Sequence, residues 1–464
     1  MGAFNNSQIK NKNMNQINDL KHTTKTTPEN AEVLVLDTGA VIDPEAEAML
    51  QALHSRSIGG IKSHLEVLSR KGPEKFMSTY YVGYGHKSIG DLGSVTVFLE
   101  GISMLAAKAI QDWPLYSGQE SSTRYIDFAE QPFMNPLDSK DGEKILENWR
   151  SFYLRGLEVL PEHLKRQFPR QTGEEEKIYN KAIQARAFDI MRSFLPAGAV
   201  TNIAWHSNLR QLADKLESLH RHPLSEVRNL ASAIEEALLD KFPSSFSAER
   251  KVEKEDYYSK ISELTYFDDP QPTEFEPFTD TVDRKMLQEY QVALKERPPR
   301  TELPKVVAEC GQVGFRFLLD FGSFRDIQRH RAVTQRMPLL TTEHGFEEWY
   351  LDSLPKDLKQ EAEQVIAEQK KVIEKLPTDP EVKQYYTAMG FNTTNRLIGN
   401  LPALVYLIEL RSGRFVHPTL RKRARQMAEV LENNFSGNGL TLHLDPEPNR
   451  FDIKRGYQDI VEKE

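Results

Sequence analysis

Cysteine is almost absent from this sequence, because Cys310 is the only one among 464 residues. A single thiol has no partner for an intrachain disulfide, and it excludes a zinc site built from four cysteines. The chain also lacks a long apolar run, since its most apolar stretch, VTVFLEGISMLAAKAI, is interrupted by Glu and Lys. We therefore expect no membrane span, no secretory signal and a cytoplasmic protein.

Net positive charge is missing as well. The formal charge is −8, and hydrophobic residues make up 39 % of the chain, which is enough for folded cores. Nonspecific affinity for nucleic acid comes from basic surface, so the acidic balance argues against a nucleic-acid partner. A local cluster of cationic side chains in such a chain points instead to a small anionic ligand.

The order of the motifs indicates two related halves. Residues 208–221 (NLRQLADKLESLHR) are similar to 400–413 (NLPALVYLIELRSG), and the His-Pro step that follows each leads into a second similar pair, 223–242 and 418–435. This is an ordered internal repeat. We predict a disordered segment over 1–31, two divergent copies of one domain over 32–245 and 260–440, a linker over 246–259 and a tail over 441–464.

Local patterns predict the main elements of each half. Val95, Val97 and Leu99 alternate as in a half-buried strand, and ISMLAAKAIQ (102–111) has the composition of a helix. The other predicted elements are a helix over 208–219, a helix over 225–242 with Ser225 as N-cap, a strand over 314–322 with a helix starting at Ser323, and a charged, solvated or interhelical helix over 356–376.

The stretch RDIQRHRAVTQR (325–336) gathers several cations. A helix would put its first two arginines, Arg325 and Arg329, on one face. The planar fork of an arginine fits a phosphate or a carbonyl edge, so the cluster suits an anion site. The alternative is an ion-paired surface helix in which Asp320 and Asp326 are the partners.

A polar loop in the first half carries a second set of groups. SGQESSTRYIDF (117–128) places Glu120, Ser122, Arg124 and Tyr125 together. In an extended backbone residues 122 and 124 point the same way, and a hydroxyl with a guanidinium forms a reasonable phosphate pair. The alternative is an ordinary polar loop without a ligand.

A third stretch, GHKSIGD (85–91), holds His86, Ser88 and Asp91 between glycines. A histidine in such a loop is usually a surface residue. No further His and carboxylate ligands follow at the spacing of a metal site, so no metal is predicted.

Taken in order, these stretches resemble the flavin-dependent thymidylate synthase family. The first half has GHKSIGD, a strand, QESSTRY (119–125) and RSFLPAGAVTNIAWHSNLRQLADKL (192–216), and the second half has the Arg-His-Arg run at 329–331. The resemblance implies an α/β (α+β) fold: a twisted sheet with flanking helices, a thymidylate-synthase-complementing-protein-like domain present in two copies. It also implies a homodimer that forms a pseudo-tetramer.

The two halves depart from the family pattern in complementary ways. At the Arg-His-Arg position the first half reads DWP (112–114), and at the Ser-x-Arg-Tyr position the second half reads LLTT (339–342). Arg192 has no counterpart in the second half, and Arg411 falls where the first half has Leu219. The resemblance therefore implies one composite site, formed from both halves, with the reciprocal site lost.

The resemblance also implies roles for single residues. The reaction is reductive methylation of dUMP to dTMP, with FAD as cofactor and NADPH and methylenetetrahydrofolate as co-substrates. Arg411 and Ser122 are the implied catalytic residues, Arg411 by stabilising charge drawn onto the uracil oxygens. The implied substrate-binding residues are Glu120, Ser122, Arg124, Arg192 and Arg411, and the implied FAD-binding residues are Arg329, His330, Arg331, Ser88, Asp91, Asn208, Arg210, His86 and Tyr125.

Two other functions stay open from the sequence. One is a flavin- and folate-dependent C5 modification of another pyrimidine nucleotide. The other is a non-catalytic homologue that binds a nucleotide, left after both copies lost part of the site.

Overall fold

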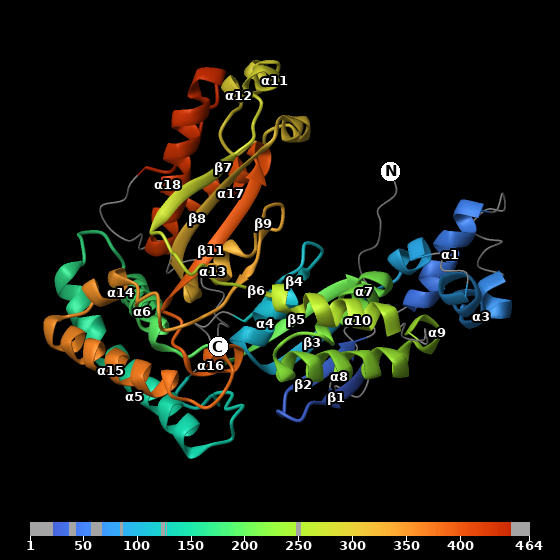
Figure 1. Ribbon diagram of the computed structural model, residues 1–464, viewed down its shortest axis with the longest axis horizontal. Coiled ribbons are helices and arrows are strands. Elements are labelled where there is room, and N and C mark those ends of the chain that lie inside the picture. The colour runs from blue at the N-terminus through green and yellow to red at the C-terminus, as the bar shows by residue number, and fades with distance from the viewer. Residues whose placement is uncertain are drawn as a thin grey trace, which may run out of the picture.

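The computed structural model describes residues 22–36, 43–56, 67–83, 87–121, 126, 128–246 and 252–446. Figure 1 shows two sheets in different parts of the molecule, one from the blue-to-green first half and one from the yellow-to-red second half. Helices flank both sheets, so the predicted fold class is confirmed. Within the described part of the chain, no helix is both long and apolar enough to cross a bilayer.

The first sheet has five strands in the order β1-β2-β3-β5-β4, and all neighbours are antiparallel. Its strands are β1 (His22–Thr26), β2 (Glu32–Leu36), β3 (Ser94–Ser103), β4 (Ser117–Glu120) and β5 (Val200–Asn208). Val95, Val97 and Leu99 are all buried, as their alternation predicts. The disorder predicted for 1–31 is wrong for its last part, because β1 pairs with β2 and Ala31 is buried. Residues 1–21 lie outside the described residues.

The helical elements of the first half are α1 (Pro44–Arg56), α3 (Glu74–Phe76), η2 (Met77–Gly83), η3 (Lys87–Leu92), α4 (Met104–Gln111), α5 (Lys140–Gln167), α6 (Glu176–Met191), η5 (Arg192–Phe194), α7 (Leu209–Leu219), α8 (Ser225–Lys241) and α9 (Pro243–Phe246). Of these, α4, α7 and α8 match the predicted helices, and the long helices α5 and α6 are not among the predictions. The Ser225 cap is a correction. Leu224 occupies the N-cap of α8 without a side-chain hydrogen bond, and Ser225 is already helical.

The second sheet has four strands in the order β7-β8-β11-β9. They are β7 (Phe275–Asp280), β8 (Gln312–Asp320), β9 (Thr334–Gln335) and β11 (Asn392–Asn400). A separate parallel pair joins β6 (Tyr266–Phe267) to β10 (Met337–Pro338). The predicted linker runs into α10 (Val252–Ile261) and then η6 (Ser262–Leu264), so much of it is helical.

The helical elements of the second half are α11 (Arg284–Gln288), α12 (Gln291–Lys295), η7 (Lys305–Cys310), α13 (Phe321–Ile327), α14 (Glu348–Asp352), α15 (Lys356–Glu374), α16 (Pro380–Lys383), η8 (Gln384–Tyr386), α17 (Leu401–Arg411), α18 (Pro418–Phe435) and η9 (Ser436–Asn438). The charged helix α15 packs along α5, where Gln369 Nε2 donates to the carbonyl of Ile145 at 2.7 Å. It is therefore an interhelical surface.

Helix α13 is shorter than the sequence predicts. It ends at Ile327, and the chain then turns, with the amide of His330 donating to the carbonyl of Ile327 at 3.0 Å. Arg325 is helical and Arg329 is not, so the prediction that the two share a helical face is wrong. The turn instead separates the directions of the cationic side chains.

The two halves have the same order of central elements. In each, a long strand leads into a helix (β3 to α4, β8 to α13), and its antiparallel neighbour leads into another (β5 to α7, β11 to α17). The caps of α7 and α17 match closely, because the side-chain oxygens of Asn208 and Asn400 accept from the amides of Gln211 and Ala403 at 2.8 and 3.0 Å. This order fits the predicted repeat, while the predicted domain boundaries stay predictions.

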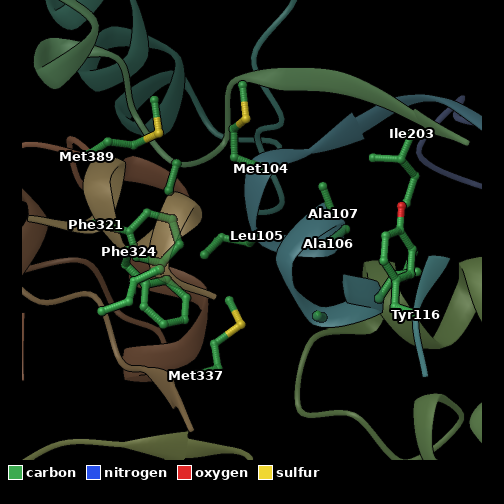
Figure 2. Close-up of a cluster of buried hydrophobic side chains, with 14 of the residues drawn as sticks. Met104, Leu105, Ala106, Ala107, Tyr116, Ile203, Phe321, Phe324, Met337 and Met389 are labelled. Atoms are coloured by element: carbon green, nitrogen blue, oxygen red, sulfur yellow. The ribbon is translucent and has the colours of Figure 1, made fainter. Parts of the chain in front are cut away.

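The halves meet through a hydrophobic core and a backbone junction. Figure 2 shows Met104 and Leu105 of α4 beside Phe321 and Phe324 of α13, all of them buried in one cluster. The backbone junction contains four hydrogen bonds in two matching pairs. Ala197 N to Thr387 O matches Met389 N to Leu195 O, and Gly198 N to Tyr385 O matches Gly390 N to Ser193 O, at 2.7–2.9 Å. An approximate two-fold axis therefore relates the halves within one chain.

Candidate functional site

A cavity of about 1500 Å³ opens where the two halves meet. From the first half it is lined by Gln119, Glu120, Ser121 and Arg192. Its second-half lining includes Arg325, Asp326, Arg329, Tyr406 and Arg411. Arg192 of the first half and Arg329 and Arg411 of the second thus line a single cavity within one chain.

Arg192 is the main cation from the first half. It begins η5, directly after α6, and its side chain is only 15 % exposed. Asp189 Oδ1 lies 4.0 Å from Nη1, and Nε has no hydrogen-bond partner among the described residues. Burial acts to lower the pKa of Arg192, but Asp189 together with Tyr350, Asp326 and Asp320 outweighs it, and the pKa is raised. The side chain stays charged and lines the cavity as a cation.

Arg411, the last residue of α17, is held from two sides. Its Nε donates to His330 Nε2 at 2.7 Å, and its Nη2 donates to the carbonyl of Asp326 at 2.8 Å. Burial, helped by Arg411 itself, lowers the pKa of His330 to about 3. A neutral imidazole accepts the hydrogen bond, so His330 fixes the direction of the guanidinium.

The Arg-His-Arg run therefore divides its side chains among three places. Arg329 lines the cavity with a side chain that is 52 % exposed, and its closest carboxylate is Asp326, at 3.8 Å. Arg331 lies over the ring of Tyr116 at 5.0 Å and is not among the described residues that line the cavity. Of the three residues, Arg329 is the one whose charge is directed into the cavity.

Glu120 forms ion pairs with a cation from each half. Its carboxylate accepts from Lys108 Nζ at 2.6 Å, from Gln111 Nε2 at 3.1 Å and from Arg325 Nη2 at 2.5 Å. Burial acts to raise the pKa of Glu120, but Arg325 and Lys108 outweigh burial and hold the pKa well below its ordinary value. Glu120 thus reaches the cavity wall as the centre of a buried ion triad, and its predicted contact with a substrate stays a prediction.

The other predicted FAD residues of the first half lie elsewhere. Arg210 Nε pairs with Asp91 Oδ1 at 2.7 Å, and Asn208 caps α7. None of these three, nor the exposed Ser88, is among the described residues that line the cavity. His86, Ser122, Arg124 and Tyr125 fall outside the described residues. The structure therefore brings together Arg192, Glu120, Arg329 and Arg411 of the predicted set.

The sequence analysis missed part of the cavity wall. Tyr406 of α17 is half exposed there, and its ring lies 5.9 Å from the ring of His330. Residues 442–446, predicted as part of a tail, also line the cavity. The amide of His443 donates to Glu409 Oε1 at 2.8 Å, which holds this segment against α17. The hydrophobic spacing of α17 points to Tyr406 only weakly, and no motif marks the segment after α18.

The geometry alone defines a class of protein. It is a two-part α/β protein with an arginine-rich cavity between its parts, which suits a ligand that carries phosphate or an electron-rich ring. Among the described residues, no group of three or more His, Cys, Asp and Glu side chains could hold a metal ion.

Comparison with known families gives the identity of the first half. Residues 40–244 match the family model described as thymidylate synthase complementing protein. The chain therefore carries a domain of this family, and the resemblance predicted from the sequence is confirmed. This match of the first half supports a thymidylate synthase-like function in general terms.

Three relatives are similar over most of their length. UPF0159 proteins from Chlamydia pneumoniae and Chlamydia muridarum are 27 % and 26 % identical, covering 76 % and 75 % of this chain and 77 % of each relative. A UPF0159 protein from Thermoplasma acidophilum is 21 % identical, covering 79 % of this chain and 87 % of its own. Matches of this length extend past residue 244 into the second half.

Proposed function

We propose that this protein is a flavin-dependent thymidylate synthase that converts dUMP to dTMP with methylenetetrahydrofolate, FAD and NADPH. The proposed site is composite, with one half supplying Arg192 and the other supplying Arg329 and Arg411. The observation that carries this proposal is the shared cavity, which all three residues line within one chain. Neither half alone has this set of cations.

The cavity fits the ligands of this reaction in charge and size. Arg192, Arg325 and Arg329 all line the cavity, and the side chain of Arg329 is half exposed, so the wall presents positive charge to an anionic ligand. A volume of about 1500 Å³ exceeds the roughly 300–1,000 Å³ of a pocket for one drug-sized ligand. A nucleotide together with a flavin suits that space.

Arg411 suits the activation of uracil. C5 of uracil is a poor nucleophile, and it gains strength when negative charge on the ring oxygens is stabilised. A guanidinium held by His330 and by the carbonyl of Asp326 is already oriented, so it needs no reorganisation as that charge develops. We assign Arg411 to the base in this way, and Arg192 to the phosphate.

FAD, when bound, supplies the hydride. Arg329 is the described residue of the predicted flavin set that reaches the cavity, and we assign it to the electron-rich edge of the flavin. Ser88, Asp91, Asn208 and Arg210 would reach a flavin in this cavity only from a second chain. The predicted homodimer would bring them there.

The test is release of tritium from [5-³H]dUMP in the presence of FAD, NADPH and methylenetetrahydrofolate. Arg192→Ala and Arg411→Ala, which change different halves, are each expected to lower kcat/KM by about 10²–10³-fold, as loss of one oriented donor does. Arg155→Ala removes an exposed arginine of α5 and is the matched control. Full activity in either cavity variant would contradict the composite site. Binding of dUMP without tritium release would favour the non-catalytic homologue.

A further inference from the structure

The two-fold relation between the halves defines a second position that corresponds to the cavity. The matching junction bonds pair Ser193 with Tyr385, which places Gln384 where Arg192 stands in the first half. Both residues begin a short 3-10 turn before the inner strand, η5 in one half and η8 in the other. We call this second position the mirror site.

The mirror site has lost each cation of the cavity. Asp112 directly follows α4. Counted from the N-caps, Ser103 for α4 and Asp320 for α13, Asp112 stands at the position of Arg329. Leu219 ends α7 where Arg411 ends α17. In place of a ligand, an internal contact satisfies this region, because Lys215 Nζ donates to the carbonyl of Asp112 at 3.1 Å.

A segment of the chain lies over the mirror site. The connecting segment, which we define as residues 252–268, ends in β6, which pairs in parallel with β10 so that Tyr266 is opposite Met337. The pairing of β9 with β11 in the second half corresponds to the pairing of β4 with β5 in the first half. When the two registers are aligned, Met337 stands at the position of Glu120 in the cavity wall. The amide of Leu339 donates to the carbonyl of Phe267 at 2.9 Å, and Arg336 donates to the carbonyls of Leu264 and Tyr266.

Tyr266 extends from this segment into the mirror site. Its ring centre lies 5.9 Å from that of His222, in an edge-on arrangement, and its hydroxyl oxygen is buried. Burial raises the pKa of the hydroxyl. Gln384, the counterpart of Arg192, lies next to the strand that pairs with β6, because its Oε1 accepts from the amide of Leu340 at 3.0 Å. Beside Glu120, by contrast, Gln119 and Ser121 line open space.

We propose that Tyr266 of the connecting segment occupies the place of the ligand in the mirror site, so that each chain has one nucleotide site and a permanently filled second position. The stoichiometry rests on the proposed function. The filling does not, because it follows from the pairing of β6 with β10 and from the contact between Tyr266 and His222. The mirror site is thus a packed junction that joins the connecting segment to both halves.

The experiment compares Tyr266→Ala with wild type in two measurements on the full chain. Thermal unfolding tests the filling. Loss of a buried aromatic ring leaves a cavity, so the Tm of Tyr266→Ala is expected to fall by about 5 °C, and p-cresol, which has the shape of the lost side chain, is expected to restore part of it. Tyr257→Ala, which removes an exposed tyrosine of α10, is the control. Its Tm is expected to equal that of wild type and to stay the same when p-cresol is added. Tyr266→Phe keeps the ring and serves if Tyr266→Ala fails to fold; its Tm is expected to stay within about 2 °C of wild type.

Titration calorimetry with dUMP tests the stoichiometry, with one site per chain expected for wild type and for Tyr266→Ala. Two sites per wild-type chain would overturn the proposal, and so would a Tyr266→Ala variant whose Tm equals that of wild type or does not respond to p-cresol. Absence of dUMP binding would overturn the proposed function and the stoichiometry, while the Tm and the p-cresol response would still decide whether Tyr266 fills the mirror site.

Discussion

The cavity and the mirror site stand at equivalent positions of one two-fold arrangement, yet they differ in charge and in filling. The cavity has Arg192, Arg329 and Arg411 around open space. The mirror site has Gln384 in place of Arg192, and the side chain of Tyr266 lies against His222 there. A pocket that no longer binds a ligand exposes buried groups without partners, which costs stability. Here the chain supplies the filling itself.

The comparison also shows how the two sites depend on each other. Lys108 of α4 and Arg325 of α13 stand at equivalent positions, and both pair with Glu120, which belongs to the cavity side alone. The equivalent of Glu120 is Met337, which carries no charge and instead pairs with β6. One carboxylate thus neutralises a cation from each half, so the cavity wall and the junction between the halves share a residue.

The largest expected effect comes from removing the carboxylate of Glu120. Glu120→Ala leaves Lys108 and Arg325 buried without their counter-charge, and removal of one partner from a buried ion pair costs about 3–5 kcal/mol. We expect the free energy of unfolding in urea to fall by that amount. Glu162→Ala, which breaks an exposed pair with Lys165, is the control and should change it by less than about 0.5 kcal/mol. Equal losses in the two variants would contradict the buried triad.

The same triad predicts a dependence on pH. The pKa of Glu120 is lower in the folded protein than its ordinary value of 4.5, so its contribution to stability is complete above that pH. It is lost as the pH falls below 4.5, because the unfolded chain then takes up a proton that the folded chain does not. Glu120→Gln, measured by unfolding between pH 5 and pH 3, is expected to lose less stability on acidification than wild type.

The next largest effect is a pH dependence of stability that comes from a buried histidine at each site. Burial lowers the pKa of both His222, at the mirror site, and His330, at the cavity, to about 3. Below an unfolded value of about 6.5 the unfolded chain is protonated at each histidine and the folded chain is not, so stability falls with decreasing pH by about 1.4 kcal/mol per unit for each. His222→Gln and His330→Gln should each remove the contribution of the substituted histidine to the pH dependence of unfolding between pH 6.5 and pH 5.

The affinity for dUMP is expected to distinguish the two histidines. His330 accepts from Arg411, so His330→Gln is expected to weaken dUMP binding by about tenfold, as loss of one hydrogen bond to a charged group does. His222→Gln should leave the affinity unchanged, since its ring contacts Tyr266. Calorimetry on both variants tests this, and equal affinities would show that His330 does not position Arg411 for the nucleotide.

The smallest expected effect concerns the matched helix caps. Asn208→Ala and Asn400→Ala each remove a side-chain acceptor from the first turn of α7 or α17, and each should cost about 1 kcal/mol in urea unfolding. Asn208 is also a predicted FAD residue, and Asn400 is not. Flavin absorbance that is lower in Asn208→Ala alone would support that role, while equal absorbance in the two variants would contradict it.

Prediction from the sequence succeeded where a local pattern had one structural solution. The alternation of Val95, Val97 and Leu99 became β3, and the leucine spacing of 208–219 became the buried face of α7. It failed where tertiary contacts overrode local preference. β1 forms in a polar segment because β2 offers a strand edge. Helix α13 stops at Ile327, and the turn that follows it places His330 against Arg411.

The sequence by itself determined several central strands and helices of each half, the family match of residues 40–244 and the division of cations between two halves. Those follow from spacing and residue type, which act over a few residues. Only the tertiary structure decided that Arg192 and Arg411 face one cavity, and that Tyr266 fills the mirror site. Both outcomes depend on contacts between residues far apart in the chain, and these are fixed by how the two halves pack across their shared axis.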